Sequence, residues 1–288
     1  MHRLAVVLAV AVACGPPPAP RAPLTLTDSG ALSAPVTIGG RELAFLVDTG
    51  ATDSAINRAT WSALGLPHGE RVTAGGASNV LRPAELVPVR SLRVAGREVR
   101  DTTVMVLDHI AQHEGRDLLD GILGHDVLGR YIVEIDTPRR RLILHERSST
   151  AWRTPDLVAV AYRPALGSLI MLPGAIDDVR CAIILDSGAG VSIASTRAAP
   201  GAKPQSDQGA IGSDSKRLVL AVAAKRRVTI GDGAVVVAAE RLHVADLPAF
   251  AALGLASKPA LLLGMDLLAT VRVVIDPFAK RVYFARST

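Results

Sequence analysis

The sequence is short of aromatic residues, of cysteines and of long apolar runs, and each shortage excludes a class of protein. Aromatic side chains make up 3% of the 288 residues, so the stacking platforms that hold single-stranded nucleic acids are missing. Beyond the N-terminus, no segment reaches the roughly 18 consecutive apolar residues that a membrane-spanning helix requires. Two cysteines are too few for a disulfide framework, so packing must stabilise the fold.

What the chain has instead is apolar and turn-forming residues. Hydrophobic residues account for 49% and charged residues for 20%, with 25 Gly and 18 Pro, which excludes a disordered polar chain and a coiled coil. The length suffices for one large domain or for two of about 140 residues. The net charge of +5 could indicate a polyanionic partner, but the basic residues are scattered along the chain. We therefore attribute the charge to solubility and expect no nucleic-acid partner.

The N-terminus has the pattern of an export signal. A short basic region at residues 1–3 precedes an apolar segment at residues 4–13 and then Cys14. Residues 11–15 resemble the lipobox of bacterial lipoproteins, in which the cysteine is lipidated and becomes the first residue of the mature chain. Ala11 stands where leucine is usual, so ordinary signal-peptidase cleavage stays an alternative, as does an uncleaved apolar N-terminus.

The lipobox resemblance implies an exported bacterial lipoprotein, anchored in a membrane through Cys14 and facing the periplasm or the outside. Residues 1–14 would be the signal peptide, and the proline-rich residues 15–27 a semi-rigid tether. With lipid on Cys14, the other cysteine, Cys181, has no disulfide partner within the chain, and we interpret it as an inert core thiol.

The remaining chain is a tandem repeat. A displacement of 138 residues places the Asp-Thr-Gly-Ala of residues 48–51 on the Asp-Ser-Gly-Ala of residues 186–189, and Ser54 on Ser192. A displacement of 140 residues places a second set of landmarks, Gly124 to Arg141, on Gly264 to Arg281. Gene duplication followed by fusion explains both matches. The expected division is an N-terminal lobe over residues 28–147, a polar linker over 148–156 and a C-terminal lobe over 157–288.

Each unit has the pattern of a β protein. Apolar segments at residues 36–38 and 44–47 flank two glycines, a signal for a two-residue hairpin. Residues 132–144 and 272–284 predict one more hairpin near the end of each unit. Residues 58–64, ended by a glycine, predict a short helix.

The most informative segments are two turns that carry aspartates. Asp48 and Asp186 each end a buried apolar strand and precede a hydroxyl residue and a glycine. A carboxyl at such a position costs desolvation unless it is paired or hydrogen-bonded. A single Asp-Thr-Gly also fits an ordinary turn. Two copies, each followed at a matching distance by an apolar-apolar-Gly segment at 122–124 and 262–264, favour a functional site.

At these residues the sequence resembles the aspartic peptidases, and most closely their retropepsin-like bacterial branch, whose short units carry Asp-Thr-Gly-Ala. The resemblance covers roughly residues 30–285 as two units. It implies an all-β fold of two similar barrel lobes related by pseudo-twofold symmetry, with few short helices. The two aspartate turns would meet between the lobes, supported from behind by the apolar-apolar-Gly segments. The hydroxyls of Thr49 and Ser187 would make reciprocal hydrogen bonds that lock the turns together.

The chemistry that the resemblance implies is peptide hydrolysis by a catalytic pair, Asp48 and Asp186. Two carboxyls a few ångströms apart cannot both ionise, so they share one proton. The ionised carboxylate takes a proton from a water molecule that attacks the peptide carbonyl, and the protonated partner donates to the carbonyl oxygen. The reaction requires neither metal nor cofactor. Gly50 and Gly188 leave room for the water and the substrate beside the backbone.

Units of this kind also carry a hairpin flap that closes over an extended peptide. The candidates are Gly75-Gly76 in the first unit and Ile211-Gly212 in the second, each lying about 25 residues after its aspartate. Neither segment contains a tyrosine, unlike the flap of pepsin. Ordinary solvent-exposed turns are the alternative interpretation.

Three weaker signals have simpler explanations. His109 and His113 have a helical spacing that suits zinc, but the glutamate of the usual zinc motif is absent, which favours a polar connection. The basic clusters at residues 139–141 and 225–227 could contact phosphate, but they lie beside predicted turns and are expected to be solvated hairpin ends.

Two further interpretations remain beside the enzyme. A non-catalytic lipoprotein with two lobes could bind extended peptides without cleaving them, although degenerate lobes usually lose one aspartate and both are present here. Two chains could pair lobes between molecules, as single-unit retropepsins do, but the fused repeat makes this unnecessary. We therefore expect a monomeric aspartic endopeptidase that acts on extended peptides or proteins.

Overall fold

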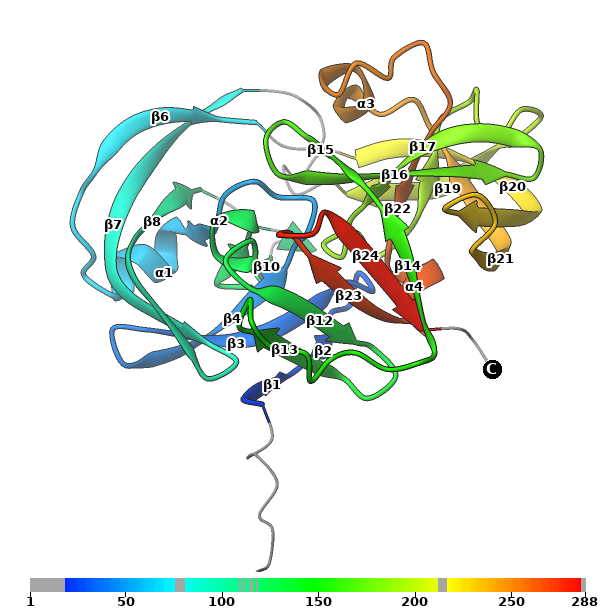
Figure 1. The fold of residues 1–288 in the computed structure, drawn as a ribbon. Coiled ribbons are helices and arrows are strands. Elements are labelled where there is room, and N and C mark those ends of the chain that lie inside the picture. The colour runs from blue at the N-terminus through cyan, green and yellow to red at the C-terminus, as the bar shows by residue number, and fades with distance from the viewer. Residues whose placement is uncertain are drawn as a thin grey trace, which may run out of the picture.

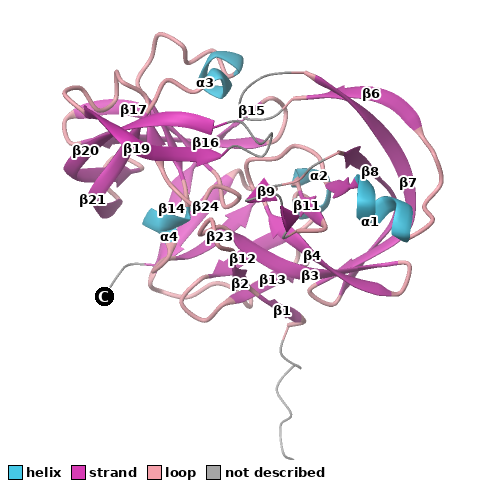
Figure 2. Cartoon of the chain, turned by 180° about the vertical axis from the view of Figure 1, so that it is seen from behind, coloured by secondary structure: helices cyan, strands magenta, loops and turns pink. Residues whose placement is uncertain are grey.

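The two repeat units fold into two lobes with the same strand order, joined by a third sheet to which both contribute (Figures 1 and 2). The computed structural model describes residues 19–75, 81–108, 110, 112–113, 116–117, 119–211 and 217–285. Most of these residues are in strands, and the helices among them are few and short. The predicted all-β fold of two retropepsin-like lobes is confirmed.

The first lobe is built from eight strands. They are β2 (Thr25–Leu26), β3 (Leu32–Ile38), β4 (Arg41–Val47), β5 (Ala55–Asn57), β6 (Glu70–Ala74), β7 (Arg82–Val94), β8 (Arg97–Leu107) and β11 (Gly121–Leu123). Their order in the sheet is β2-β3-β4-β11-β5-β8-β7-β6, and an additional pairing of β3 with β7 closes the six central strands into a barrel. β11 thus lies between β4 and β5, parallel to β4.

The second lobe repeats this arrangement strand for strand. Its strands are β15 (Arg163–Ala165), β16 (Leu169–Ile176), β17 (Val179–Leu185), β18 (Ile193–Ala194), β19 (Lys203–Ile211), β20 (Arg217–Ile230), β21 (Val235–Val244) and β22 (Ala260–Leu263). Their order is β15-β16-β17-β22-β18-β21-β20-β19, and β16 pairs with β20 to close the barrel. β22 takes the place of β11, parallel to β17.

The first hairpin of the first barrel forms as the sequence predicts. Gly39 and Gly40 have φ angles of 58° and 78°, which a two-residue turn between twisted strands needs and glycine adopts without strain. Alternate residues of the flanking strands then face the core, so that Val36, Ile38 and Phe45 are almost fully buried.

Four short helices lie among the described residues: α1 (Arg58–Ala63), α2 (His125–Leu128), α3 (Pro248–Ala252) and α4 (Met265–Leu268). α1 confirms the helix predicted over residues 58–64, and the side chain of Asn57 caps it by accepting a hydrogen bond from the Thr60 N–H. α2 and α4 directly follow the glycines Gly124 and Gly264 of the two apolar-apolar-Gly segments. Within the described part of the chain, no helix is long and apolar enough to cross a membrane.

The hairpins predicted near the end of each unit are present, and together they form the sheet that joins the lobes. Its strands are β1 (Arg21–Pro23), β12 (Ile132–Asp136), β13 (Arg141–His145), β14 (Leu157–Ala161), β23 (Arg272–Asp276) and β24 (Arg281–Ala285). The order is β1-β13-β12-β23-β24-β14, so β12 of one unit pairs with β23 of the other at the centre. The two lobes are therefore hydrogen-bonded into one sheet rather than connected by a linker alone.

The prediction of a tether over residues 15–27 is wrong for its second half. β1 pairs with β13 and β2 pairs with β3, and Ala22 and Leu24 are buried. β1 occupies the edge of the shared sheet equivalent to that of β14 in the second unit. The first repeat therefore begins near residue 21 rather than 28, because these residues complete the sheet. Cys14 and the predicted signal peptide lie outside the described residues.

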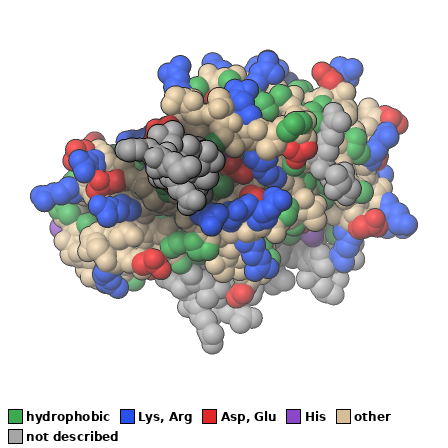
Figure 3. Space-filling model, turned by 60° about the horizontal axis from the view of Figure 1, so that its bottom comes forward, with side chains coloured by type: hydrophobic (Ala, Val, Ile, Leu, Met, Phe, Trp, Pro, Cys, Tyr) green, Lys and Arg blue, Asp and Glu red, His purple; other side chains and the backbone are tan. Residues whose placement is uncertain are grey.

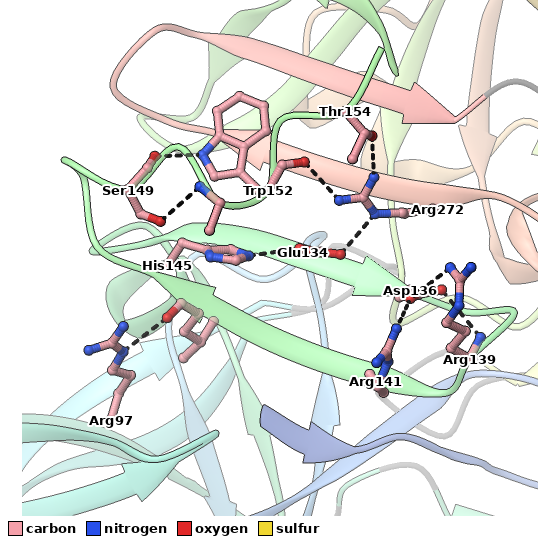
Figure 4. Close-up of polar contacts among 12 residues, drawn as sticks. Arg97, Glu134, Asp136, Arg139, Arg141, His145, Ser149, Trp152, Thr154 and Arg272 are labelled. Atoms are coloured by element: carbon pink, nitrogen blue, oxygen red, sulfur yellow. Dashed lines mark hydrogen bonds and ion pairs between the residues drawn. The ribbon is translucent and has the colours of Figure 1, made fainter. Parts of the chain in front are cut away.

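The linker between the lobes is held against the shared sheet by polar contacts that start from the buried Glu134 (Figure 4). The carboxylate of Glu134 accepts hydrogen bonds from Arg272 Nε at 2.8 Å and interacts with His145 Nε2 at 2.7 Å. The same guanidinium donates to the Trp152 carbonyl and to Thr154 Oγ1, both at 2.8 Å. The linker prediction of a purely polar segment is thus incomplete, since Trp152 is buried against the sheet.

The basic residues do not gather into one patch on the face shown in Figure 3, where Lys and Arg side chains alternate with Asp and Glu. Arg139 and Arg141 lie at the β12–β13 hairpin end, as predicted, and their guanidiniums pair with Asp136. The cluster at residues 225–227 differs from its prediction. It lies inside β20, where Lys225 has a φ of 43° and the register with β21 is the same on both sides of it, and not at a hairpin end.

Candidate active site

Asp48 and Asp186 follow the equivalent central strands β4 and β17. The Asp48 N–H donates to the Leu123 carbonyl at 3.1 Å, and the Asp186 N–H donates to the Leu263 carbonyl at 3.0 Å. Leu123 and Leu263 end β11 and β22, which run parallel to β4 and β17. The apolar-apolar-Gly segments therefore lie directly beside the aspartate strands, and each fixes the point at which its aspartate leaves the barrel.

The two turns are joined across the lobes by four hydrogen bonds. Thr49 Oγ1 donates to the Leu185 carbonyl at 3.1 Å and accepts from the Ser187 N–H at 2.9 Å. Ser187 Oγ donates to the Val47 carbonyl at 2.7 Å and accepts from the Thr49 N–H at 3.2 Å. Both hydroxyls are buried. Each therefore uses a donor and an acceptor function on the opposite lobe, which is the reciprocal arrangement expected from the sequence.

The glycines after the hydroxyl residues bring each turn against the opposite carboxyl. A Cβ on Gly50 would lie 2.5 Å from Asp186 Cγ, and a Cβ on Gly188 would lie 2.4 Å from Asp48 Cγ. Real Cβ atoms do not approach other atoms so closely, so only glycine fits. The same residues supply donors, because the Gly50 N–H bonds to Asp48 Oδ1 at 2.8 Å and the Gly188 N–H bonds to Asp186 Oδ1 at 2.9 Å.

The electrostatics of the pair follow from burial and proximity. Burial raises the pKa of Asp48 well above its ordinary value, and the negative charge of Asp186 raises it further, while the Gly50 N–H lowers it in part. Burial also raises the pKa of Asp186, against hydrogen bonds from Asp48 and from the backbone N–H groups of Gly188 and Ala189. Two carboxyls so placed hold one proton between them over a wide pH range. Such a pair can act as acid and as base in one step.

A second polar pair behind each turn was not assigned a role from the sequence. Ser54 Oγ donates to Asp126 Oδ1 at 2.7 Å and accepts from the Gly124 N–H at 3.0 Å. In the second lobe, Ser192 Oγ donates to Asp266 Oδ1 at 2.6 Å. These bonds tie Ser54 and Ser192, which lie a few residues after the two turns, to α2 and α4. The signal was available, because these serines and aspartates match each other in the repeat.

The flap candidates lie where hairpins occur. Gly75 follows β6, which pairs with β7, and Ile211 ends β19, which pairs with β20. Gly76 and Gly212 lie outside the described residues. Whether these hairpins close over a substrate stays a prediction.

The weaker signals of the sequence do not form a second site among the described residues. His109 lies outside them, and the polar connection instead contains a small hairpin of β9 (Gln112–His113) and β10 (Arg116–Asp117). No three His, Cys, Asp or Glu side chains gather as metal ligands in the part of the chain that is described. Cys181 is buried, and burial raises the pKa of its thiol to about 12, in agreement with an inert core residue.

Comparison with known proteins gives a family match for the first lobe. No curated protein matches the chain. Residues 34–127 match the model of a protein family described as aspartyl protease. This range runs from β3 to α2 and contains the first aspartate turn together with the segment that supports it. The first lobe is therefore similar to aspartyl proteases, and the second lobe repeats its strand order.

Proposed function

We propose that the protein is an exported aspartic endopeptidase in which Asp48 and Asp186 form the catalytic dyad. The observation that carries the proposal is the close approach of each carboxyl to the glycine of the opposite turn, at 2.4 and 2.5 Å from the position of a Cβ. This geometry joins two acids from two lobes into one site. The match of residues 34–127 to aspartyl proteases supports the same reaction class.

In the proposed mechanism one proton is shared between the carboxyls and a water molecule lies between them. The ionised carboxylate accepts a proton from the water, and the water oxygen attacks the peptide carbonyl carbon. The protonated partner donates its proton to the carbonyl oxygen, which gives a neutral tetrahedral intermediate. Proton transfer to the amide nitrogen then breaks the C–N bond. The backbone N–H groups of Gly50 and Gly188 hold the carboxylates in place during these steps.

The proposed substrate is an extended peptide or protein segment that lies across both turns, and the β6–β7 and β19–β20 hairpins are the proposed flaps. An edge of such a hairpin can add main-chain hydrogen bonds to an extended peptide. Because one chain supplies both aspartates, the proposed enzyme is active as a monomer. Cys14 is the proposed site of a lipid anchor that would place it at a membrane facing the periplasm or the outside.

The dyad is tested with Asp48→Asn and Asp186→Asn, assayed on a mixed peptide library between pH 4 and 8. We expect each variant to lose cleavage by a factor of at least about 10³ and to stay folded, because both carboxyls must share one proton. Asp232→Asn is the matched control: this aspartate lies in the exposed β20–β21 turn at φ 48°, a conformation that Asn tolerates. Most activity remaining in either dyad variant would refute the proposal. Wild type that binds peptides without cleaving them would support the non-catalytic alternative.

The lipid anchor is tested separately by the intact mass of the mature protein purified from membranes. We expect an N-terminal Cys14 that carries acyl chains, and partition into a detergent phase. Cys14→Ser should leave the protein soluble or unprocessed. A mature N-terminus at any other residue would contradict the anchor and leave the dyad proposal untouched.

A further inference from the structure

Each aspartate turn accepts a backbone hydrogen bond from the first residue of the helix behind it, but the side chain of that first residue differs between the two lobes. The His125 N–H donates to the Ala51 carbonyl at 3.0 Å, and the Met265 N–H donates to the Ala189 carbonyl at 2.8 Å. His125 and Met265 are thus equivalent positions, the first residues of α2 and α4. Only His125 has a side chain that can donate a strong hydrogen bond.

The imidazole of His125 reaches the turn that carries the first aspartate. Its Nε2 lies 2.9 Å from the Thr49 carbonyl oxygen. A carbonyl oxygen only accepts, so Nε2 must carry the proton. Thr49 C=O and Gly50 N–H belong to the same peptide group, and the Gly50 N–H donates to Asp48 Oδ1 at 2.8 Å. A continuous chain of hydrogen bonds therefore runs from His125 through one peptide group to the carboxylate of Asp48.

Hydrogen bonds in such a chain strengthen one another by polarisation. A donor on the Thr49 oxygen withdraws electrons from the peptide group and makes the Gly50 N–H a better donor to Asp48. In the second turn the Gly188 N–H bonds to Asp186 Oδ1 at 2.9 Å, but the thioether of Met265 cannot donate to the turn. The glycine donors of the two carboxyls thus differ in strength, and Asp186 Oδ1 also accepts a hydrogen bond from the Ala189 N–H at 3.1 Å.

We propose that His125 is a positioning residue that acts through the Thr49–Gly50 peptide group to stabilise the ionised form of Asp48. The inference rests on the proposed function where it concerns catalysis, but the hydrogen-bond chain can be tested without it. His125 touches neither the substrate nor the reacting atoms. Its role is to make the two halves of a nearly symmetric site unequal.

The surroundings of His125 favour a neutral donor near neutral pH. Burial lowers the pKa of His125, and the hydrogen bond to the Thr49 carbonyl opposes this in part. The acidic groups near it are Asp126 on its own helix, which is bonded to Ser54, and Asp53 on the loop that packs against Gly124. Asp48 itself lies beyond the Thr49–Gly50 peptide.

The size of the effect follows from the bond that is strengthened. A gain of roughly 10–30% in one charge-assisted hydrogen bond corresponds to about 0.1–0.7 of a pKa unit. Because Asp48 is the carboxyl that keeps its proton while Asp186 is ionised, we expect His125→Met, which copies the second lobe, to raise the higher apparent pKa of the dyad by a few tenths of a unit. His125→Gln keeps an N–H donor and should restore most of the shift. Met265→Leu is the matched control at the equivalent position and should leave the titration unchanged.

The measurement is the ¹³Cγ NMR titration of labelled aspartates, assigned with Asp48→Asn and Asp186→Asn, together with the ¹⁵N spectrum of His125 in the wild-type protein. The spectrum should show the Nε2–H tautomer, and this needs no variant. A titration that does not move in folded His125→Met, or an Nδ1–H tautomer, would overturn the inference. The basic limb of kcat/KM, which reports the loss of the second proton from the dyad, should move upward with the same variant.

This design separates the two proposals. If the wild-type protein cleaves no peptide but the titration moves as expected, the role of His125 stands and the peptidase proposal falls. If the wild-type protein cleaves peptides and the titration does not move, the dyad stands and the role of His125 falls.

Discussion

Arg272→Ala should destabilise the protein strongly, because it removes one of the two side chains, Arg272 and His145, that interact with the buried carboxylate of Glu134. The side chains of Arg272 and Glu134 are 12% and 6% exposed, and their ion pair has an N–O distance of 2.8 Å. Removing one partner from a buried pair costs about 3–5 kcal/mol, mostly because the remaining charge is uncompensated. With an unfolding entropy of about 2.1 cal/mol/K per residue, this corresponds to a fall in Tm of about 5–8 °C.

A matched control lies on the first barrel. Arg100 Nη2 and Glu98 Oε2 are also 2.8 Å apart, but their side chains are 73% and 27% exposed. An exposed pair contributes at most about 1 kcal/mol, so Arg100→Ala should lower Tm by no more than about 2 °C. The two ion pairs have the same N–O distance but differ in burial, so comparing them separates the effect of burial from the effect of geometry.

The assay is thermal unfolding followed by circular dichroism and by calorimetry at pH 7, and one transition is expected because the lobes share a sheet. Adding Glu134→Gln to Arg272→Ala removes the uncompensated charge and should recover part of the loss. Equal destabilisation by Arg272→Ala and Arg100→Ala, or no recovery in the double variant, would refute the reasoning.

Three further predictions concern pH and the site. Burial alone would raise the pKa of Glu134, but the hydrogen bonds from His145 and Arg272 outweigh burial and lower that pKa. The stability that Glu134 contributes is therefore present above the pKa of an ordinary Glu, and it is lost as the pH falls through the pKa of Glu134 in the folded protein. Urea denaturation between pH 3 and 7 should show this loss in the wild type and a flatter curve in Glu134→Gln. Gly188→Ala should abolish cleavage, since its Cβ would overlap the carboxyl of Asp48. The control variant, Gly233→Ala in the β20–β21 turn at φ 87°, should lower stability by about 1 kcal/mol and leave kcat/KM unchanged. An active Gly188→Ala enzyme would contradict this prediction. Ala51→Thr with Ala189→Thr adds hydroxyl donors beside the carboxylates, which should lower the apparent pKa values of the dyad and move the optimum of kcat/KM to lower pH; an optimum that stays or rises would contradict this.

The sequence was sufficient to predict features that depend on local pattern. The duplicated Asp-hydroxyl-Gly turns, the hairpin at Gly39-Gly40 and the helix near residue 58 each have a signal within a few neighbouring residues. The repeat then predicts that what forms in one unit forms in the other. The β character of both units follows from these signals, whereas the two barrel lobes and the meeting of the two turns were expected from the resemblance to aspartic peptidases.

Features that depend on distant partners were missed. Residues 21–24 look like the end of a proline-rich tether, and residues 21–23 become a strand because β13, far along the chain, accepts them, as when the Leu24 N–H bonds to the Arg140 carbonyl at 2.9 Å. The contact of His125 with Thr49 joins residues 76 apart in sequence. Neither partner carries a local mark of the other, so only the folded structure pairs them.

The pairing of β12 with β23 contains a record of the duplication. Glu134 lies opposite Val274, and the repeat makes these two the same position of the two units. In a dimer of identical single units that residue would face its own copy, and two glutamates there would place like charges side by side in a buried strand pair. Once both copies lay in one chain they could diverge, so that one became a glutamate held by Arg272 and the other a valine. With both copies in one chain, the buried Glu134 lies opposite an apolar residue and is held by Arg272 instead of facing a second carboxylate.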